Sequence, residues 1–238
     1  MERPTPPHRA LITGSNRGLG LALVHQLLSR GYEVHAINRR VSEDLEDQRQ
    51  QFPDQLFLYT GDVRDEDSIK SAVAEVAKNV DGLELVVNNA AVHPDPERAP
   101  LEKADFSGYL EAFDINAIGP LRVLKHALPL VRKGHEPRIV NISSEAGSCG
   151  ENWRSSEYGY CMSKAALNRA TTILHEYVKG DGIKVLAMHP GWFSSDMGGE
   201  KAPITPEDAA GNIIGLITGK LPHPQALYVS PEGQPMQF

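Results

Sequence analysis

A chain of 238 residues, 40% of them apolar and 23% charged, is long enough to bury the core of one α/β domain. Its formal charge of −7 argues against nucleic-acid binding, because phosphate backbones require clustered lysine and arginine. The start MERPTPPHRA lacks an apolar signal-peptide stretch and no apolar run approaches the roughly 20 residues that cross a bilayer, so we expect a cytoplasmic protein without a membrane partner.

Short apolar runs alternate with helix-patterned segments along the chain. The expected strands lie at residues 9–13, 32–38, 56–60, 83–90, 137–143, 183–190 and 226–230. Of the intervening helices, one is closed by Gly31, one is opened by Ser42 and one by Asp65 with an acidic first turn. This alternation predicts an α/β fold with a doubly wound, parallel, seven-stranded sheet (a Rossmann fold). We expect a single domain over residues 8–238, preceded by a disordered tail at 1–7.

The stretch TGSNRGLG follows the first expected strand and opens the first helix. Glycines at its turn allow close approach of the backbone to a pyrophosphate, and the helix N-terminus supplies N–H groups and positive potential. A glycine-rich turn alone is weak evidence, so a plain structural turn is the alternative. The expected dinucleotide contacts are Gly14, Ser15, Asn16, Arg17, Gly18, Leu19 and Gly20.

The second expected strand ends in INRR. Enzymes that prefer NAD place an acid near this point to hold the ribose 2′-hydroxyl, whereas a basic residue accommodates the 2′-phosphate of NADP. Asn38, Arg39 and Arg40 supply two cations and no acid, and Arg17 adds charge nearby. The alternative is a pair of solvated surface arginines. The pattern predicts NADP(H) as the cofactor, with Asn38 and Arg39 as contacts and Arg39 as the stronger candidate.

The stretch YGYCMSK at residues 158–164 offers an acid for proton transfer. Moving a hydride between nicotinamide and a carbonyl carbon requires a proton at the oxygen, and free tyrosine, with a pKa near 10, is too weak an acid unless an ammonium favours its phenolate. Helix positions i and i+4 share a face, so Tyr160 pairs with Lys164. Tyr158 lies on another face and is expected to be a wall or packing residue.

Residue spacing does not decide which serine binds the substrate oxygen, nor what Asn116 does. A hydroxyl donor must hold the substrate oxygen, and Ser143 and Ser144 both follow the fifth expected strand with their side chains on opposite faces. Asn116 interrupts a long helical pattern in which asparagine is neutral or unfavourable. Taken alone, Asn116 would bond to its own helix backbone and bend the helix.

These motifs, in this order, resemble the short-chain dehydrogenase/reductase family from about residue 8 to the C-terminus. The glycine turn resembles the family's TGxxxGxG, Tyr160 to Lys164 its YxxxK, NNAA at 88–91 its NNAG and HPGWFSSDM its PG turn. The chain is most similar to small carbonyl-reductase-like members, a group that includes developmental C-factor signalling proteins.

The resemblance implies residue roles that spacing does not decide. Ser144 would orient the substrate, Lys164 would also hold the ribose, and the helix would bulge at Asn116 to bind a water that relays protons to Lys164. Further cofactor contacts would follow the third, fourth and sixth strands, at Asp62, Val63, Asn89, Ala90, Pro190, Gly191 and Ser195. Asp62 could equally be a loop or capping residue. Ser195 replaces the family's threonine, and Ala91 replaces the NNAG glycine.

The resemblance implies an NADPH-dependent carbonyl reductase acting on an aldehyde, ketone or quinone. The alternative is a dinucleotide-binding signalling protein of the C-factor type that acts through a partner; an epimerase or dehydratase would need a second acid-base group. By analogy, helices around 105–133 and 157–178 would build a homodimer or homotetramer. The lid at 192–205 is short, which predicts an open pocket lined by Trp153, Trp192 and Phe193.

Three other residues near these motifs are assigned no chemistry. Cys149 and Cys161 lack metal-site and disulfide spacing, and we expect buried spectators in a reducing compartment. His189 precedes the PG turn without a visible acid partner, and we expect it to be structural. No metal site is expected.

Overall fold

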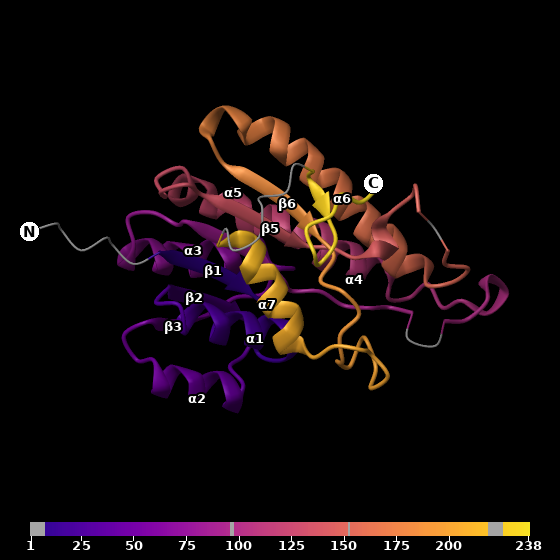
Figure 1. Ribbon diagram of the computed structural model, residues 1–238, viewed down its shortest axis with the longest axis horizontal. Coiled ribbons are helices and arrows are strands. Elements are labelled where there is room, and N and C mark those ends of the chain that lie inside the picture. Colours follow the sequence, from indigo (N-terminus) through magenta and orange to yellow (C-terminus); the bar gives the residue numbers. More distant parts are fainter. Residues whose placement is uncertain (1–7, 96–97, 152, 219–225) are drawn as a thin grey trace, which may run out of the picture.

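The computed structural model describes residues 8–95, 98–151, 153–218 and 226–238, and the expected tail at 1–7 lies outside them. All seven expected strands are present in one parallel sheet of order β3-β2-β1-β4-β5-β6-β7 (Figure 1). They are β1 (Arg9–Thr13), β2 (Glu33–Asn38), β3 (Leu56–Thr60), β4 (Leu85–Asn88), β5 (Arg138–Ile142), β6 (Lys184–Met188) and β7 (Tyr228–Val229). The strand order reverses between β1 and β4, which opens a crevice at their carboxyl ends.

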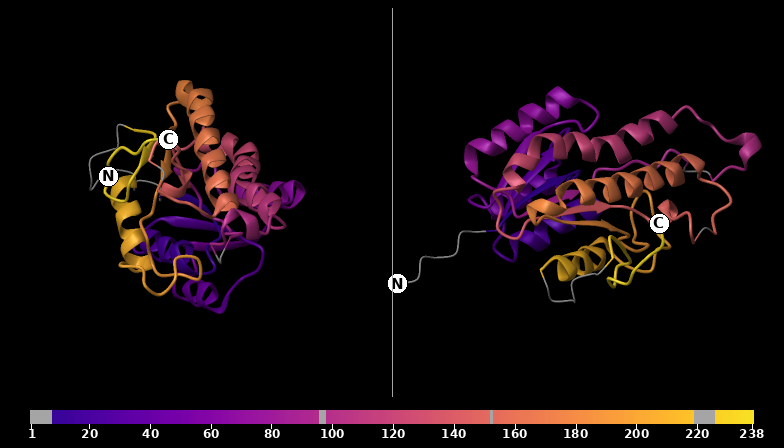
Figure 2. Two further views of the ribbon diagram at one scale, coloured as in Figure 1. Left: turned by 90° about the vertical axis from the view of Figure 1, so that its right-hand side faces the viewer. Right: turned by 90° about the horizontal axis from the view of Figure 1, so that it is seen from above.

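Helices cover both faces of the sheet (Figure 2). They are α1 (Gly18–Leu28), α2 (Glu43–Gln51), α3 (Glu66–Asn79), α4 (Tyr109–Phe113), α5 (Gly119–Val131), α6 (Tyr158–Val178) and α7 (Pro206–Ile217). One core cluster joins α1 and α7 to one face, with Leu23 and Ile213 fully buried. A second core cluster joins α3 and α5 to the other face of the sheet, with Val73 and Val123 buried. The crevice therefore lies between two layers of helices packed on the sheet.

Local sequence signals explain where these helices begin. The side chain of Ser42 accepts a hydrogen bond from the Leu45 N–H, and that of Asp65 accepts from the N–H groups of Asp67 and Ser68, as expected of N-caps. Helix α1 ends at Leu28, earlier than expected, and the chain then reverses at Gly31, whose φ is 78°.

The long helical pattern before β5 is interrupted. Helix α4 leads into a π-helical turn, Asp114–Ile118, before α5 begins. Such π-bulges widen the backbone ladder and are frequent at functional sites. Asn116 lies at the centre of this turn, so the bulge implied by the resemblance is present.

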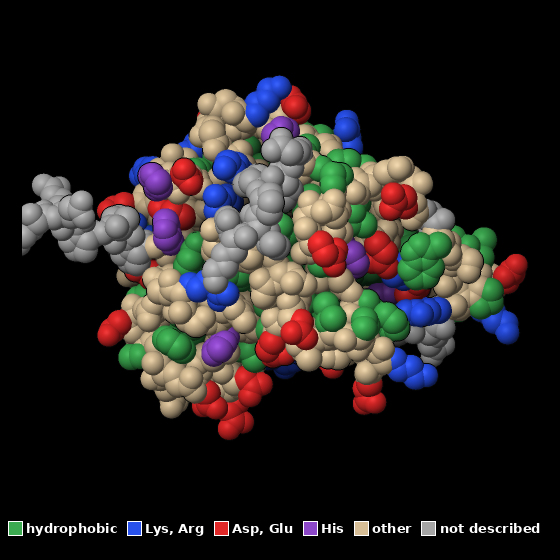
Figure 3. All heavy atoms as spheres, viewed as in Figure 1, with side chains coloured by type: hydrophobic (Ala, Val, Ile, Leu, Met, Phe, Trp, Pro, Cys, Tyr) green, Lys and Arg blue, Asp and Glu red, His purple; other side chains and the backbone are tan. Residues whose placement is uncertain are grey.

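The surface does not gather one sign of charge on the face of Figure 3, where acidic and basic side chains are interspersed. Within the described part of the chain, no helix combines the length and apolar character that a membrane span requires. The expectation that both cysteines are buried was wrong: Cys149 is exposed and Cys161 is only half-buried. Cys149 lies in a loop after β5 that the core does not cover.

Candidate active site

The glycine turn between β1 and α1 begins the site. Gly14 and Gly18 have φ values of 69° and 52°, a region that disfavours residues with a side chain. A Cβ at Gly14 would lie 2.7 Å from the Ala90 Cα, and one at Gly20 would lie 2.2 Å from the Gly14 carbonyl oxygen. At Gly18, by contrast, an added Cβ would meet nothing within 4 Å. The turn is therefore packed tightly against the protein at Gly14 and Gly20 and has open space beside it at Gly18.

The N-terminus of α1 is available to an anion. Its N-cap, Arg17, has extended backbone and no side-chain cap, and the first turn contains no acid. The first N–H groups of a helix have no intrahelical partner and carry positive potential. This arrangement fits a dinucleotide pyrophosphate, as the sequence predicted for Gly18, Leu19 and Gly20.

Asparagine side chains hold the glycine turn in shape through hydrogen bonds. The Asn38 side chain accepts from the Ser15 N–H at 2.7 Å and donates to the Ser15 hydroxyl at 2.8 Å. Asn89 donates to the Gly14 carbonyl at 2.8 Å, and Asn16 donates to the Arg40 carbonyl. These asparagines, expected as cofactor contacts, use their amides to hold the shape of the turn.

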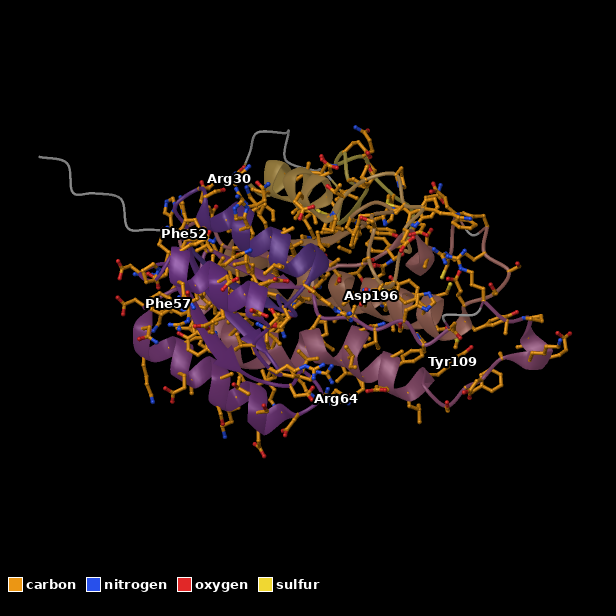
Figure 4. All side chains as sticks on the ribbon, turned by 90° about the horizontal axis from the view of Figure 1, so that it is seen from below. Arg30, Phe52, Phe57, Arg64, Tyr109 and Asp196 are labelled. Carbon is orange, nitrogen blue, oxygen red and sulfur yellow. The ribbon has the colours of Figure 1, made fainter. Side chains whose placement is uncertain are left out.

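The basic residues predicted to read the 2′-phosphate lie at the surface. Arg39 is exposed and is close enough to Asp62 to contribute to lowering the pKa of that carboxyl, although hydrogen bonds from Arg64 contribute most. Arg17 pairs with Asp196. Figure 4 labels Asp196, which lies on the segment after β6. The structure thus makes Asp62 partly a loop-structuring residue, which is the alternative left open by the sequence.

A cavity of about 340 Å³ extends from the glycine turn toward the start of α6. Its lining includes Arg17 from the turn, Ala91 and His93 after β4, and Glu157 before α6. Ala91, the departure from the family's glycine, therefore faces the space beside the turn. The cavity connects the expected dinucleotide site with the expected catalytic helix.

Tyr160 and Lys164 come together on α6 as their spacing predicted. Both side chains are buried, and the Lys164 Nζ lies 5.8 Å from the centre of the Tyr160 ring. The same Nζ donates to the Ile142 carbonyl at 2.8 Å, which ties α6 to the end of β5. Tyr158, two residues before Tyr160, is half-buried.

The protonation of this pair differs from the expectation that Lys164 lowers the pKa of the tyrosine. Burial raises the pKa of Tyr160 to about 12, although its side-chain hydrogen bond with Ser144 acts to lower it. Burial also lowers the pKa of Lys164 to about 8. The phenol accordingly keeps its proton at neutral pH and is able to donate it.

The two serines after β5 are separated by strand alternation. The Ser143 hydroxyl donates to the Asn168 side chain at 2.6 Å and is buried beneath α6. The Ser144 hydroxyl is within hydrogen-bonding reach of Tyr160 and accepts from the Ala146 N–H at 3.2 Å. Of the two, Ser144 is the one placed beside Tyr160.

Asn116 bonds across the site rather than to its own helix, so the alternative in which its side chain bonds to the helix backbone was wrong. Its side chain accepts from the Val92 N–H at 2.8 Å and donates to the Val92 carbonyl at 2.9 Å. It also donates to the Ser163 hydroxyl at 2.9 Å, and Ser163 donates to the Tyr160 carbonyl. The π-helical turn thus fixes the loop after β4 against α6.

The segment after β6 matches its expected position but differs in two side chains. Gly191 has a φ of 88° and permits the turn after the buried Pro190. The Ser195 hydroxyl accepts from the Gly198 N–H at 2.9 Å and so structures the short lid. Phe193 packs against the core beside Ile204, so the expectation that it lines the pocket was wrong.

The two tryptophans expected at the pocket are exposed. Trp192 is 54% exposed and its indole N–H donates to the Gly198 carbonyl at 2.8 Å. Trp153 is 73% exposed and the guanidinium of Arg154 lies over its ring. Neither tryptophan is among the residues that line the 340 Å³ cavity, so the open pocket lined by these rings stays a prediction.

Sequence reasoning missed a histidine beside the tyrosine. The His93 ring stacks on Tyr160 with centroids 4.4 Å apart, and its Nε2 lies 3.0 Å from the buried carboxylate of Glu157. Asp95 accepts from the Tyr160 N–H at 3.0 Å. His93 and Asp95 follow β4, so the rule that sites gather at the carboxyl ends of strands could have pointed to them.

A second missed group surrounds Ser144. Glu145 accepts from the Ser144 hydroxyl at 2.6 Å, and Arg154 bridges Glu145 to Glu157. The His189 Nδ1 lies 3.4 Å from Glu145, so the expectation that His189 has no acid partner was wrong. Burial lowers the pKa of His189 despite that neighbour. Charged and titratable groups therefore line the site on both sides of Tyr160.

Comparison with known proteins agrees with this geometry. A family model described as short chain dehydrogenase matches residues 8–204. The short-chain dehydrogenase srdF of Neurospora crassa is 30% identical and covers 87% of this chain and 88% of its own. C-signal of Myxococcus xanthus is 32% identical over 151 residues, which are 63% of this chain and 90% of that protein.

Solved structures of carbonyl reductases share the fold over nearly the full length. Carbonyl reductase Sniffer of D. melanogaster gives a TM-score of 0.90 at 30% identity, covering 98% of this chain and 100% of its own. An NADPH-bound carbonyl reductase from chicken fatty liver gives a TM-score of 0.86 at 28% identity. The match covers 98% of this chain and 100% of the reductase.

Proposed function

The chain belongs to the short-chain dehydrogenase family, and from this premise we propose that it is a cytoplasmic, NADPH-dependent reductase of aldehydes, ketones or quinones. The observation that carries the proposal is the buried, protonated Tyr160 beside Ser144 and Lys164. Its ring stacks on His93, which lines the cavity that starts at the glycine turn. The likeness to carbonyl reductases, one of them with NADPH bound, supports both the reaction and the cofactor.

In the proposed reaction, side chains of this protein donate the proton and orient the substrate oxygen. The nicotinamide, when bound, supplies the hydride. Tyr160 gives its phenolic proton to the carbonyl oxygen, and Ser144 donates a hydrogen bond that orients that oxygen. The Lys164 ammonium then favours the phenolate that remains. Tyr160 carries its proton at neutral pH, as the donor in a reduction must, and its transfer requires a cation that stabilises the phenolate.

The proposed cofactor contacts follow the crevice. The N–H groups at the start of α1 would bind the pyrophosphate, and Asp62 and Val63 would flank the adenine. The backbone at Asn89, Ala90, Pro190 and Gly191 and the hydroxyl of Ser195 would line the nicotinamide half. Asn116 would bind the relay water through its backbone, because its amide is fully engaged with Val92 and Ser163.

Replacing Arg39 with alanine is expected to weaken NADPH binding by ~10- to 100-fold, since a hydrogen bond to a charged group contributes about 1.5–3 kcal/mol. NADH binding should change little, because NADH lacks the 2′-phosphate. Fluorescence titration of both cofactors measures the effect, with Arg40→Ala as the neighbouring control. A wild-type protein that binds NAD(H) as tightly as NADP(H) would contradict the assignment.

The pH dependence of kcat/KM should show a fall as pH rises through about 8. Lys164 is charged below its lowered pKa of about 8 and neutral above it, so its support for the phenolate is lost in that range. Tyr160 keeps its proton until about pH 12 and adds no step nearby. A profile that is flat to pH 10, or one that rises through pH 8, would be inconsistent with these roles.

A second candidate function is a dinucleotide-binding signalling protein that acts through a partner. The 32% identity with C-signal favours it. The presence of Tyr160, Lys164 and Ser144 in one buried site favours the enzyme, because a binding protein has no need of a proton donor.

We also propose a homodimer or homotetramer formed through α4, α5 and α6. Large apolar side chains are exposed on these helices: Leu110 is 84% exposed, Ile173 56% and Tyr177 68%. Burying such groups in an interface is favourable. Light scattering on the purified protein should give the mass of a dimer or tetramer, and the mass of a single chain would rule the proposal out.

A further inference from the structure

The carboxylate of Glu145 lies one hydrogen bond from the hydroxyl that is proposed to hold the substrate oxygen. Its Oε2 is 2.6 Å from the Ser144 Oγ, a distance typical of a hydroxyl donating to an ionised carboxylate. The Glu145 side chain is 24% exposed, so it is neither sealed in the core nor fully in solvent. A substituent next to the substrate carbonyl would therefore meet this carboxylate.

Glu145 is held in place as an anion. Arg154 pairs with its Oε1 and is itself anchored by the buried Glu157, while the His189 Nδ1 lies 3.4 Å from Oε2. Burial acts to raise the pKa of Glu145, but hydrogen bonds from Ser144 and Arg154 outweigh it and leave the pKa below its ordinary value. The negative charge thus stays fixed beside the catalytic hydroxyls.

Ser144 has one proton, and in this structure Glu145 receives it. To donate to a substrate oxygen the hydroxyl must turn away, which leaves Oε2 without a strong donor. An acceptor that loses its partner in a partly buried site is destabilised. A substrate that brings its own donor restores the missing hydrogen bond, whereas a substrate with an anionic group there meets like charge.

Resting on the reductase function proposed above, we propose that Glu145 selects carbonyl compounds with a hydroxyl or ammonium group on the carbon next to the carbonyl. The same carboxylate disfavours compounds that carry a carboxylate at that position. Glu145 would then be a specificity-determining residue of this chain that contacts the substrate through this substituent and takes no part in proton transfer.

Three aryl ketones that share a phenyl group test this inference. They are 2-hydroxyacetophenone, which carries the donor, 2-methoxyacetophenone, which keeps the electron-withdrawing oxygen without the donor, and phenylglyoxylate, which carries a carboxylate. The kcat/KM of each is measured for the wild-type protein, for Glu145→Gln and for Glu151→Gln. The last variant removes the same charge from an exposed position in the same loop.

The wild-type protein should prefer the hydroxy compound over the methoxy compound by ~10- to 100-fold. Glu145→Gln should reduce that ratio by about tenfold and raise kcat/KM for phenylglyoxylate, with NADPH binding and Tm retained, while Glu151→Gln matches the wild type. A wild-type ratio near one, or a ratio unchanged by Glu145→Gln, overturns the inference but leaves the reductase function intact. Failure of the wild-type protein to reduce any carbonyl compound overturns the proposed function, and the inference with it.

Discussion

Replacing Tyr160 with phenylalanine is expected to lower the rate of carbonyl reduction by ~10²- to 10⁴-fold, the usual contribution of a positioned general acid. The substitution removes the proton donor and keeps the ring that stacks on His93, so the fold and the cofactor site should persist. Initial rates of NADPH oxidation measure the loss, and a binding titration checks the cofactor site.

The control for this substitution is Tyr158→Phe. Tyr158 precedes Tyr160 by two residues but lies six residues from Lys164, on a different face of α6. Its removal should leave the rate within a small factor of the wild type. Equal losses in both variants would indicate damage to α6 in general, and full activity of Tyr160→Phe would show that another group supplies the proton.

The same variant separates the two candidate functions. A reductase loses turnover when the phenolic hydroxyl is removed, although it still binds NADPH. A signalling protein that acts through a partner should keep its cellular role, since the surface and the bound dinucleotide are unchanged. Unaltered cellular activity of Tyr160→Phe would therefore favour the likeness to C-signal over the likeness to carbonyl reductases.

Lys164→Met is expected to lower reduction by ~10²- to 10³-fold without lowering Tm at pH 7, because the ammonium supports developing phenolate charge. Desolvation lowers the pKa of Lys164 from 10.5 to about 8, so holding it charged destabilises the native state at neutral pH. Methionine has a similar volume and no charge. The lost bond to the Ile142 carbonyl partly offsets the gain.

The sign of this effect with pH follows from linkage. Between about pH 8 and pH 10.5 the unfolded lysine binds a proton that the folded lysine does not, so the stability of the wild-type protein rises with pH. The advantage of Lys164→Met should be greatest below pH 8 and fade as pH approaches 10.5. Thermal unfolding of both proteins at pH 7 and pH 10 measures it, with the exposed Lys125→Met as control. A large loss of stability at pH 7 would contradict this account.

Local patterns predicted the parts of the site that depend on local geometry. Apolar runs located all seven strands, and the i to i+4 spacing selected Tyr160 because helix geometry alone places it beside Lys164. Strand alternation correctly separated Ser143 from Ser144, although it did not say which faces the tyrosine. These features require no knowledge of which segments pack together.

The remaining features arise from contacts between distant segments. His93 meets Glu157 from 64 residues away, and His189 meets Glu145 across two loops. The Asn38 amide holds the glycine turn because β1 and β2 are neighbours in the sheet, a pairing that a single residue pattern does not reveal. The raised pKa of Tyr160 depends on how completely its site is buried, so spacing predicted the partner but not the resulting acidity.

Transfer of deuterium from NADPH with deuterium at both C4 positions of the nicotinamide tests the central claim most directly. The purified protein is incubated with the labelled cofactor and a ketone such as 2-hydroxyacetophenone, and the product is examined by mass spectrometry and NMR. We expect an alcohol with deuterium on the former carbonyl carbon, formed by the wild-type protein and at least ~10²-fold more slowly by Tyr160→Phe. Unlabelled alcohol, or no alcohol from any aldehyde, ketone or quinone tried, would contradict it.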